Sequence, residues 1–416
     1  MVQLASRAEA RANRQVDDAP HLARRLHIAF PPFEDGFWTV GPIHLSSLLT
    51  ALRDTYGQQI GLFAFPLYGS GQPRQVGPSA QLDGVIPYGY PPRWSARWAE
   101  NWLHRHLRTR DVAIERALER YSVDAVLCPG LSSSYGRIAT MWWLTDFQHL
   151  HLPEMFDARE RAQRTAVFLR SSKVATRIIT MSDSVKRDFE AFAPKYAWKV
   201  RVLSPVSYIS QHVYGSDPLD VARAYNLPEK FVYLPNQFWK HKNHELVLRA
   251  VRILHDRGID VRVVCTGNLA DYRHPLQASQ LFHKLSVWGI RHQVIYLGLL
   301  TRDEVLALIR QSVCVLNPSL FEGWGYSVDE ARSIGKQVLL SDIPAHRDQQ
   351  PPRATYFDPF DPEDLAARLA EVWLGTQPGP DAELEAEARR LLPRRRQAYA
   401  EQFVAVAQEA IAAARA

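Results

Sequence analysis

Short runs of apolar and β-branched residues recur along the chain and alternate with longer segments whose apolar residues repeat at helical spacing. The first run, residues 26–30 (LHIAF), leads through a loop rich in Pro and Gly into an apolar-periodic segment at residues 43–52. This pattern predicts a strand, a loop and a helix. A second helix is predicted over residues 157–175. Three more strands are predicted, at residues 123–128, 177–181 and 200–203.

The alternation is most regular after residue 230. Thr301 with Glu304 forms a capping box that predicts a helix start, and Asp361 followed by Pro362 predicts another. Strands are predicted at residues 231–234, 261–265, 294–297, 313–316, 338–341 and 354–357. Helices are predicted at residues 243–255, 275–288, 328–334 and 395–416. This order indicates a Rossmann-like doubly wound sheet, which binds ligands at the carboxyl ends of its strands.

The length of 416 residues exceeds what one hydrophobic core usually organises, so we expect two domains. Residues 208–230 carry Gly, Pro and Asp but no long apolar run, and we place the boundary there. The predicted fold is α/β, with Rossmann-like domains at residues 1–212 and 213–394 and a ligand cleft between them. We expect the helix at 395–416 to pack back on the first domain and residues 1–24 to be disordered.

The composition is that of a soluble globular protein, with 46% hydrophobic and 23% charged residues. The three cysteines, Cys128, Cys265 and Cys314, lie in short apolar runs without metal-ligand spacing and are expected to be buried thiols in a reducing compartment. No run approaches the roughly 18 apolar residues of a membrane span, and the first residues lack an apolar signal region. We therefore expect a cytoplasmic protein.

Net charge is +6, and arginines cluster at residues 93–110 and 389–396. These clusters are either solvated helix faces or, for the first, a surface that adheres to an anionic membrane. The second interpretation would place the protein at the inner face of the membrane. We expect no nucleic-acid partner because no nucleic-acid motif accompanies the charge. The first cluster interleaves its charges with apolar side chains: Trp94, Trp98, Trp102 and Leu103.

The sharpest motif is the stretch at residues 317–336, NPSLFEGWGYSVDEARSIGK. Glu322 lies on a loop at a predicted helix start, and Glu330 lies about two turns into that helix. Free backbone N–H groups and the helix dipole at such a start can hold a phosphate. Carboxylates beside it suit the hydroxyls of a sugar or ribose, so the motif predicts a nucleotide-sugar site. The alternative is that both glutamates are solvated helix residues.

A second group of polar residues follows the strand at 231–234, in the sequence LPNQFWKHKNHELVLRA. Lys240 and Lys242 crowd the carboxyl edge of the predicted sheet, where a leaving pyrophosphate would lie. A lysine there neutralises the charge that develops as the glycosidic bond breaks, and Lys242 is the first candidate. The alternative is a basic surface loop.

With these motifs the chain resembles the retaining glycosyltransferases of family 4 (glycosyl transferases group 1), which have the two-domain GT-B fold. The strand-end motif of that family reads Gly-Arg, a short gap, Lys-Gly. Gln237 stands here at the place of the arginine and Lys242 at that of the lysine, and Lys240 offers a second cation.

The resemblance also implies roles for the other residues of the motifs. Glu322 would contact the transferred sugar and Glu330 the ribose hydroxyls. The base would lie against Gly298 and Leu299, and the same cleft would be lined by Gly267 and Asn268. The loop that closes on the donor would consist of Gly323, Trp324, Gly325 and Tyr326, and Ser327 would also bind the donor.

The resemblance extends into the first half through residues 143–156, WLTDFQHLHLPEMF. It implies that Asp146 and His149 contact the donor sugar or the acceptor. His149 is alternatively a structural histidine, or pairs with His151 as a metal site for which no third ligand is evident. Gly36 and Gly41 correspond loosely to the glycine loop of the family, which approaches the donor phosphate.

The implied activity is retaining transfer of a hexose from a UDP- or GDP-sugar to a hydroxyl of a glycan or lipid-linked acceptor. No metal or other cofactor is expected, since the sequence holds no Asp-x-Asp, and no P-loop or GxGxxG supports other nucleotide chemistry. Three alternatives stay open: a sugar-nucleotide epimerase or hydrolase on the same fold, a catalytically silent nucleotide-sugar-binding protein, and a hydrolase with two catalytic carboxylates.

Overall fold

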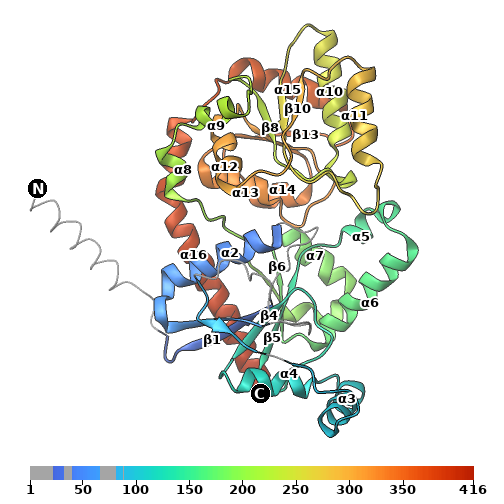
Figure 1. Ribbon diagram of the computed structural model, residues 1–416, viewed down its shortest axis with the longest axis vertical. Helices are drawn as coiled ribbons and strands as arrows, with labels where there is room; N and C mark the ends of the chain where they lie inside the picture. Colours follow the sequence, from blue (N-terminus) through green and yellow to red (C-terminus); the bar gives the residue numbers. More distant parts are fainter. Residues whose placement is uncertain (1–21, 32–39, 66–80, 88) are drawn as a thin grey trace, which may run out of the picture. The chain divides into compact units, whose positions relative to one another are not determined.

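The structure is a computed structural model of the chain, and it describes residues 22–31, 40–65, 81–87 and 89–416 (Figure 1). The expectation of disorder over residues 1–24 falls almost wholly outside these residues. Gly36 lies outside them as well.

The described residues form two sheets, and the first contains seven strands in the order β3-β2-β1-β4-β5-β6-β7. Its strands are β1 Leu26–Phe30, β2 Ile60–Ala64, β3 Gly84–Val85, β4 Ala125–Cys128, β5 Ala139–Leu144, β6 Arg177–Thr180 and β7 Val200–Val202. The pairs that β1 makes with β2 and with β4 are parallel. The helices among these strands are α2 Val40–Tyr56, α3 Ala96–Arg108, α4 Val112–Glu119, α5 Gln148–His151, α6 Ala158–Val174 and α7 Asp183–Phe192, with the 3-10 turns η1 Gly57–Gln59, η3 Pro153–Met155 and η4 Pro194–Lys199.

The second sheet has six strands among the described residues, in the order β10-β9-β8-β11-β12-β13. They are β8 Val232–Leu234, β9 Val263–Cys265, β10 Val294–Tyr296, β11 Val315–Asn317, β12 Val338–Ser341 and β13 Ala354–Phe357, all in parallel pairs. The helices are α8 Gln211–Gly215, α9 Pro218–Ala224, α10 His244–Asp256, α11 Gln277–Val287, α12 Arg302–Gln311, α13 Tyr326–Ile334, α14 Pro344–Gln349, α15 Pro362–Gly375 and α16 Ala382–Arg415, with the 3-10 turn η5 Lys240–Lys242.

The second sheet is covered on both faces, as a parallel sheet with helical crossovers requires. Alternate residues of its strands, such as Val232 and Leu234, join α10, α11 and α15 in one apolar core. Tyr233 lies between them, points to the other face and is also fully buried. The continuous apolar runs of the sequence are therefore strands with two buried faces, and the predicted α/β class with two Rossmann-like sheets is confirmed.

Helix boundaries follow the predicted caps. Thr301 and Glu304 form the capping box at the start of α12, and Asp361 caps α15 with Pro362 in its first turn. The last helix begins earlier than predicted, at Ala382 rather than at residue 395. Asp381 accepts a hydrogen bond of 3.0 Å from the backbone of Leu384, which satisfies the new helix start.

The chain divides into two compact units. Unit 1 comprises Met1–Trp143, Arg170–Ile178 and Arg396–Ala416, and unit 2 comprises Leu144–Leu169 and Ile179–Arg395. The predicted boundary at residue 212 falls between the last strand of the first sheet and the first strand of the second. The compact units divide the chain differently, so the limits 1–212 and 213–394 stay a prediction.

The end of α16 contributes to unit 1. The ring of Phe403 stacks on Phe30 at 6.2 Å, and the Tyr399 hydroxyl lies 3.4 Å from Nε2 of His44. All three cysteines are buried free thiols, and burial raises the pKa of each. No helix within the described residues is long and apolar enough to cross a membrane.

Candidate functional site

The two motifs singled out in the sequence meet in unit 2. Lys242 ends the turn η5 that follows β8, and Glu322 lies on the loop between β11 and α13. The Lys242 Nζ lies 2.5 Å from Oε1 of Glu322. Because β8 and β11 are neighbours in the sheet, their carboxyl ends bring together two residues that are 80 positions apart.

Glu322 is ionised at neutral pH. Burial raises the pKa of its carboxyl group, but the charge of Lys242, nearby His241 and hydrogen bonds from Lys242 and Ser319 together outweigh burial and bring the pKa to about 2. The Ser319 hydroxyl adds a hydrogen bond of 2.6 Å to Oε1. The carboxylate can therefore accept further hydrogen bonds, whereas it has no proton to give.

Gly325 is the N-cap of helix α13, and its φ of +85° is natural for glycine. As a glycine it has no side chain with which to cap the helix start. Two carbonyl groups of the preceding loop, those of Trp324 and Gly325, accept hydrogen bonds from Nε2 of Gln349. The two bonds from Gln349 thus fix the loop by its carbonyl oxygens, and the N-cap Gly325 contributes no capping side chain.

Gly323 holds the loop against another segment of unit 2. Its carbonyl accepts a 2.8 Å hydrogen bond from the Ser182 hydroxyl. A Cβ at this position would overlap the carbonyl oxygen of Thr145 and lie 3.2 Å from Cβ of Asp146. Only glycine permits this approach, which places Asp146 beside the glutamate loop.

Glu330 is buried and forms an ion pair with Arg302 at the start of α12. Burial lowers the pKa of Arg302, and its guanidinium also lies over the Tyr326 ring at 5.8 Å. From the sequence, we expected Glu330 to face ribose hydroxyls, and Arg302 was not predicted. The sequence feature that could have identified Arg302 is its position directly after the helix cap Thr301.

A buried amide and hydroxyl network supports the same loop. The Asn236 amide donates to Oδ1 of Asn317 at 3.3 Å, and that oxygen also accepts a 2.7 Å bond from Ser319. The Asn317 amide in turn donates to Ser327 at 3.3 Å. None of Asn236, Asn317 and Ser319 was predicted from the sequence, although each lies within three residues of the end of a predicted strand.

The residues expected to line the nucleotide cleft also lie together. Gly267 donates a 2.9 Å backbone bond to the carbonyl of Gly298, and a Cβ on Gly267 would meet the backbone of Gln237 at 2.9 Å. Asn268 accepts a 2.9 Å backbone bond from Phe238. Leu299 is 64% exposed, and the Lys240 side chain is exposed too.

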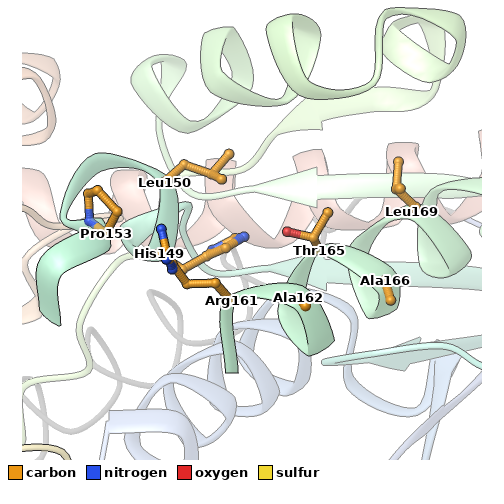
Figure 2. A pocket seen from close by; sticks show the side chains of 8 residues that line it. All are labelled: His149, Leu150, Pro153, Arg161, Ala162, Thr165, Ala166 and Leu169. Atoms are coloured by element: carbon orange, nitrogen blue, oxygen red, sulfur yellow. The ribbon is translucent and has the colours of Figure 1, made fainter. Parts of the chain in front are cut away.

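His149 lines a pocket of about 570 Å³ in unit 2. The ring is fully buried, and neither nitrogen has a hydrogen-bond partner among the described residues. Burial lowers the pKa of His149, and nearby Arg164 lowers it further. Figure 2 shows the residues of the pocket, which come from α5, η3 and α6: His149, Leu150, Pro153, Arg161, Ala162, Thr165, Ala166 and Leu169.

His151 turns to other partners. Its Nε2 lies 2.9 Å from Asp188, and its ring stacks on Phe321 at 4.6 Å. Within the part of the chain that the structure describes, no group of three or more His, Cys, Asp and Glu side chains could hold a metal ion. Gly41 lies at the start of α2 and belongs to unit 1, whereas the site residues above belong to unit 2.

Comparison with known protein families gives a match in the second half of the chain. Residues 220–389 match the family model of the glycosyl transferases group 1. These residues form a glycosyl transferases group 1 domain. The domain contains Lys242, Arg302, Glu322 and Glu330, whereas Asp146 and His149 lie before it.

Two curated proteins resemble parts of the chain. An uncharacterised glycosyltransferase of Methanocaldococcus jannaschii, MJ1607, is 27% identical over 116 residues, which cover 28% of this chain and 28% of that protein. The serotype-specific mannosyltransferase WbdA of Escherichia coli is 24% identical over 190 residues, 45% of this chain and 21% of its own. The matches thus span less than a third of the length of these relatives.

Solved structures share the fold over most of the chain. Alr3699/HepE of Anabaena, solved in complex with UDP and glucose, superposes with a TM-score of 0.61 at 14% identity, over 92% of this chain and 97% of that one. At this identity the likeness shows the fold alone. The chain has the two-domain α/β architecture of these proteins, the GT-B fold, to which the group 1 domain contributes the second sheet.

Proposed function

We propose that the chain is a retaining glycosyltransferase that moves a hexose from a UDP- or GDP-sugar to a hydroxyl of a glycan or lipid-linked acceptor, without a metal ion. The main observation that supports this proposal is the Lys242–Glu322 pair beside the start of α13. It combines a cation and the positive end of the α13 dipole for a diphosphate with a carboxylate for sugar hydroxyls. The matched group 1 domain and the names of its relatives support the same activity.

The proposed chemistry needs no protein nucleophile. The bond from the sugar C1 to the donor phosphate oxygen breaks, and a bond from C1 to the acceptor oxygen forms on the same face. The acceptor proton passes to the departing phosphate oxygen. Lys242 and the α13 dipole stabilise the charge that grows on the diphosphate, and Glu322, which is ionised, orients the hexose through its hydroxyls.

His149 is the proposed contact for the donor sugar or acceptor outside the group 1 domain. Its two buried ring nitrogens lack protein partners among the described residues, and unpartnered buried polar groups are costly. A sugar hydroxyl reaching the pocket would satisfy one of them. The pocket in Figure 2 is roomy enough for a monosaccharide and is lined largely by Leu, Ala and Pro.

The first experiment identifies the donor. Purified protein is screened by thermal shift against UDP, GDP, ADP and dTDP and their hexose derivatives, because a ligand that binds only the folded state raises its apparent stability. We expect a UDP or GDP compound to raise the melting temperature. If none of the nucleotides does so, the proposed donor class is wrong.

The second experiment separates transfer from its alternatives. Labelled donor is incubated with and without a glycan acceptor, using wild type and Glu322→Ala. Transfer with retained anomeric configuration, abolished in the variant while donor binding largely persists, supports the proposal. Free sugar released equally without acceptor would instead identify a hydrolase, and unchanged turnover in the variant would remove Glu322 from the site.

A further inference from the structure

Helix α3, residues Ala96–Arg108, exposes its apolar side chains, whereas a packed helix normally buries them. Its one buried residue is Asn101, which is 3% exposed. Trp102 is 48%, Leu103 49% and Leu107 74% exposed. These positions, with exposed Ala99 and His106, follow the i, i+3, i+4, i+7, i+8 spacing of one helix face.

Polar contacts attach the other face of α3 to unit 1. The Asn101 side chain accepts a 3.1 Å bond from the backbone of Ala113 in α4. Glu100 receives two bonds from Arg116 of α4, at 2.9 and 2.7 Å. Figure 1 shows α3 beside α4. Within the described residues, this arrangement leaves the apolar face exposed.

The segment before α3 extends this face. Trp94 is 76% exposed and adopts a positive φ of 72°, which is uncommon for a bulky residue. Its ring lies 5.1 Å from that of Trp98, and the Arg93 guanidinium lies over it at 5.1 Å. Tryptophan with an adjacent arginine is the composition found at the boundary between lipid headgroups and acyl chains.

Charge decides which partner fits. Residues 93–110 hold five arginines and one glutamate. Arg105 and Arg110 form ion pairs with carboxylates of α4 and its cap, and the other three arginines keep the stretch basic. A second copy of the same face would bring these like charges together, whereas an anionic lipid surface is complementary to them. A helix with an apolar face and many basic residues lies in the membrane interface rather than across it.

We propose that the α3 face, defined as Trp94, Trp102, Leu103 and Leu107 with Arg93, Arg97 and Arg108, docks unit 1 on an anionic bilayer surface. The apolar side chains enter the headgroup region and the arginines contact lipid phosphates. This docking does not rest on the proposed enzymatic activity, because it needs neither donor nor acceptor.

The test is cosedimentation of the full chain with vesicles of phosphatidylcholine alone and of equimolar phosphatidylcholine and phosphatidylglycerol. We expect binding to the anionic vesicles only, weakened by salt. The double variants Trp102→Ser/Leu107→Ser and Arg93→Gln/Arg97→Gln should each reduce partitioning roughly tenfold or more. Matched controls remove exposed residues elsewhere, Leu276→Ser/Phe360→Ser and Arg291→Gln/Arg390→Gln, and should bind as wild type.

Circular dichroism and melting temperature establish that each variant is folded. We expect all of them to fold, because the substituted side chains are exposed. Absence of wild-type binding to anionic vesicles overturns the proposal, as does equal binding by the α3 variants. Light scattering after size-exclusion chromatography tests whether a second copy of the chain covers the α3 face. A dimer that Trp102→Ser/Leu107→Ser dissociates, without vesicle binding, would show that a second copy covers the face.

Discussion

At the scale of single residues, the candidate site consists of two carboxylates that are each paired with a cation. Glu322 faces Lys242, and Glu330 faces Arg302. Sequence analysis could find both glutamates because their spacing and the Gly-Trp-Gly turn lie in one segment. It could not find their pairing, since each cation belongs to another strand-helix connection and only the order of the strands brings it near.

Loss of Lys242 should destabilise the fold as well as the site. The Lys242 side chain is 20% exposed and that of Glu322 10%, so Lys242→Ala leaves a largely desolvated carboxylate without its partner. We expect a loss of about 3 kcal/mol in the free energy of unfolding, measured by urea denaturation. Lys240→Ala removes an exposed lysine two positions away and should change stability by less than about 0.5 kcal/mol. Equal effects of the two substitutions would contradict the pairing.

The pH dependence of stability should report on Glu322. Its pKa in the folded chain, about 2, lies below the ordinary value of 4.5, so its stabilising contribution is present above pH 4.5 and is lost as pH falls toward 2. The stability advantage of wild type over Glu322→Gln should therefore shrink between pH 5 and pH 3 in urea titrations. A difference that does not change with pH would show that the carboxylate is not held ionised by Lys242.

At the scale of elements, the strands were the easiest part to predict. Residues 26–30 and 354–357 were predicted with the limits that β1 and β13 have, because short apolar runs in a parallel sheet are buried on both faces. No limits were predicted for helix α3, although a solvated helix face was one of the two interpretations of residues 93–110. Its apolar residues face outward, and the tertiary contacts that hold it are polar.

The loop before α13 should depend on Gly323. A methyl group there would overlap the Thr145 carbonyl, so Gly323→Ala must displace the glutamate loop. We expect a loss of about 2 kcal/mol in the free energy of unfolding, together with weakened donor binding. Gly215→Ala, where a Cβ meets nothing within 4 Å, is the matched control and should leave both unchanged. Tolerance of alanine at residue 323 would mean that the loop is not fixed as described.

At the scale of the whole molecule, the chain crosses between its two compact units several times, and α16 contributes to both. The sequence shows where one sheet ends and the next begins, because apolar alternation stops over residues 208–230. It does not show that residues 144–169 and 179–212 join the second unit, since such contacts have no local pattern.

Removal of residues 396–416 should therefore affect unit 1 selectively. The deletion takes away the buried side chains of Tyr399 and Phe403, each worth about 2 kcal/mol of burial, along with several buried aliphatic residues. We expect calorimetry to show loss of one unfolding transition while that of unit 2 remains. Removal of residues 412–416 alone should leave both unfolding transitions in place. A single cooperative transition lowered as a whole would contradict two separately stabilised units.

The central claim is that Lys242 and the start of α13 hold a nucleoside diphosphate. Isothermal titration with the diphosphate selected by the thermal screen tests it most directly, because it needs no acceptor. Wild type and the surface control Lys186→Ala should bind alike, and Lys242→Ala, measured where it is folded, should bind roughly tenfold or more weakly. Equal affinity of Lys242→Ala and wild type would contradict the account.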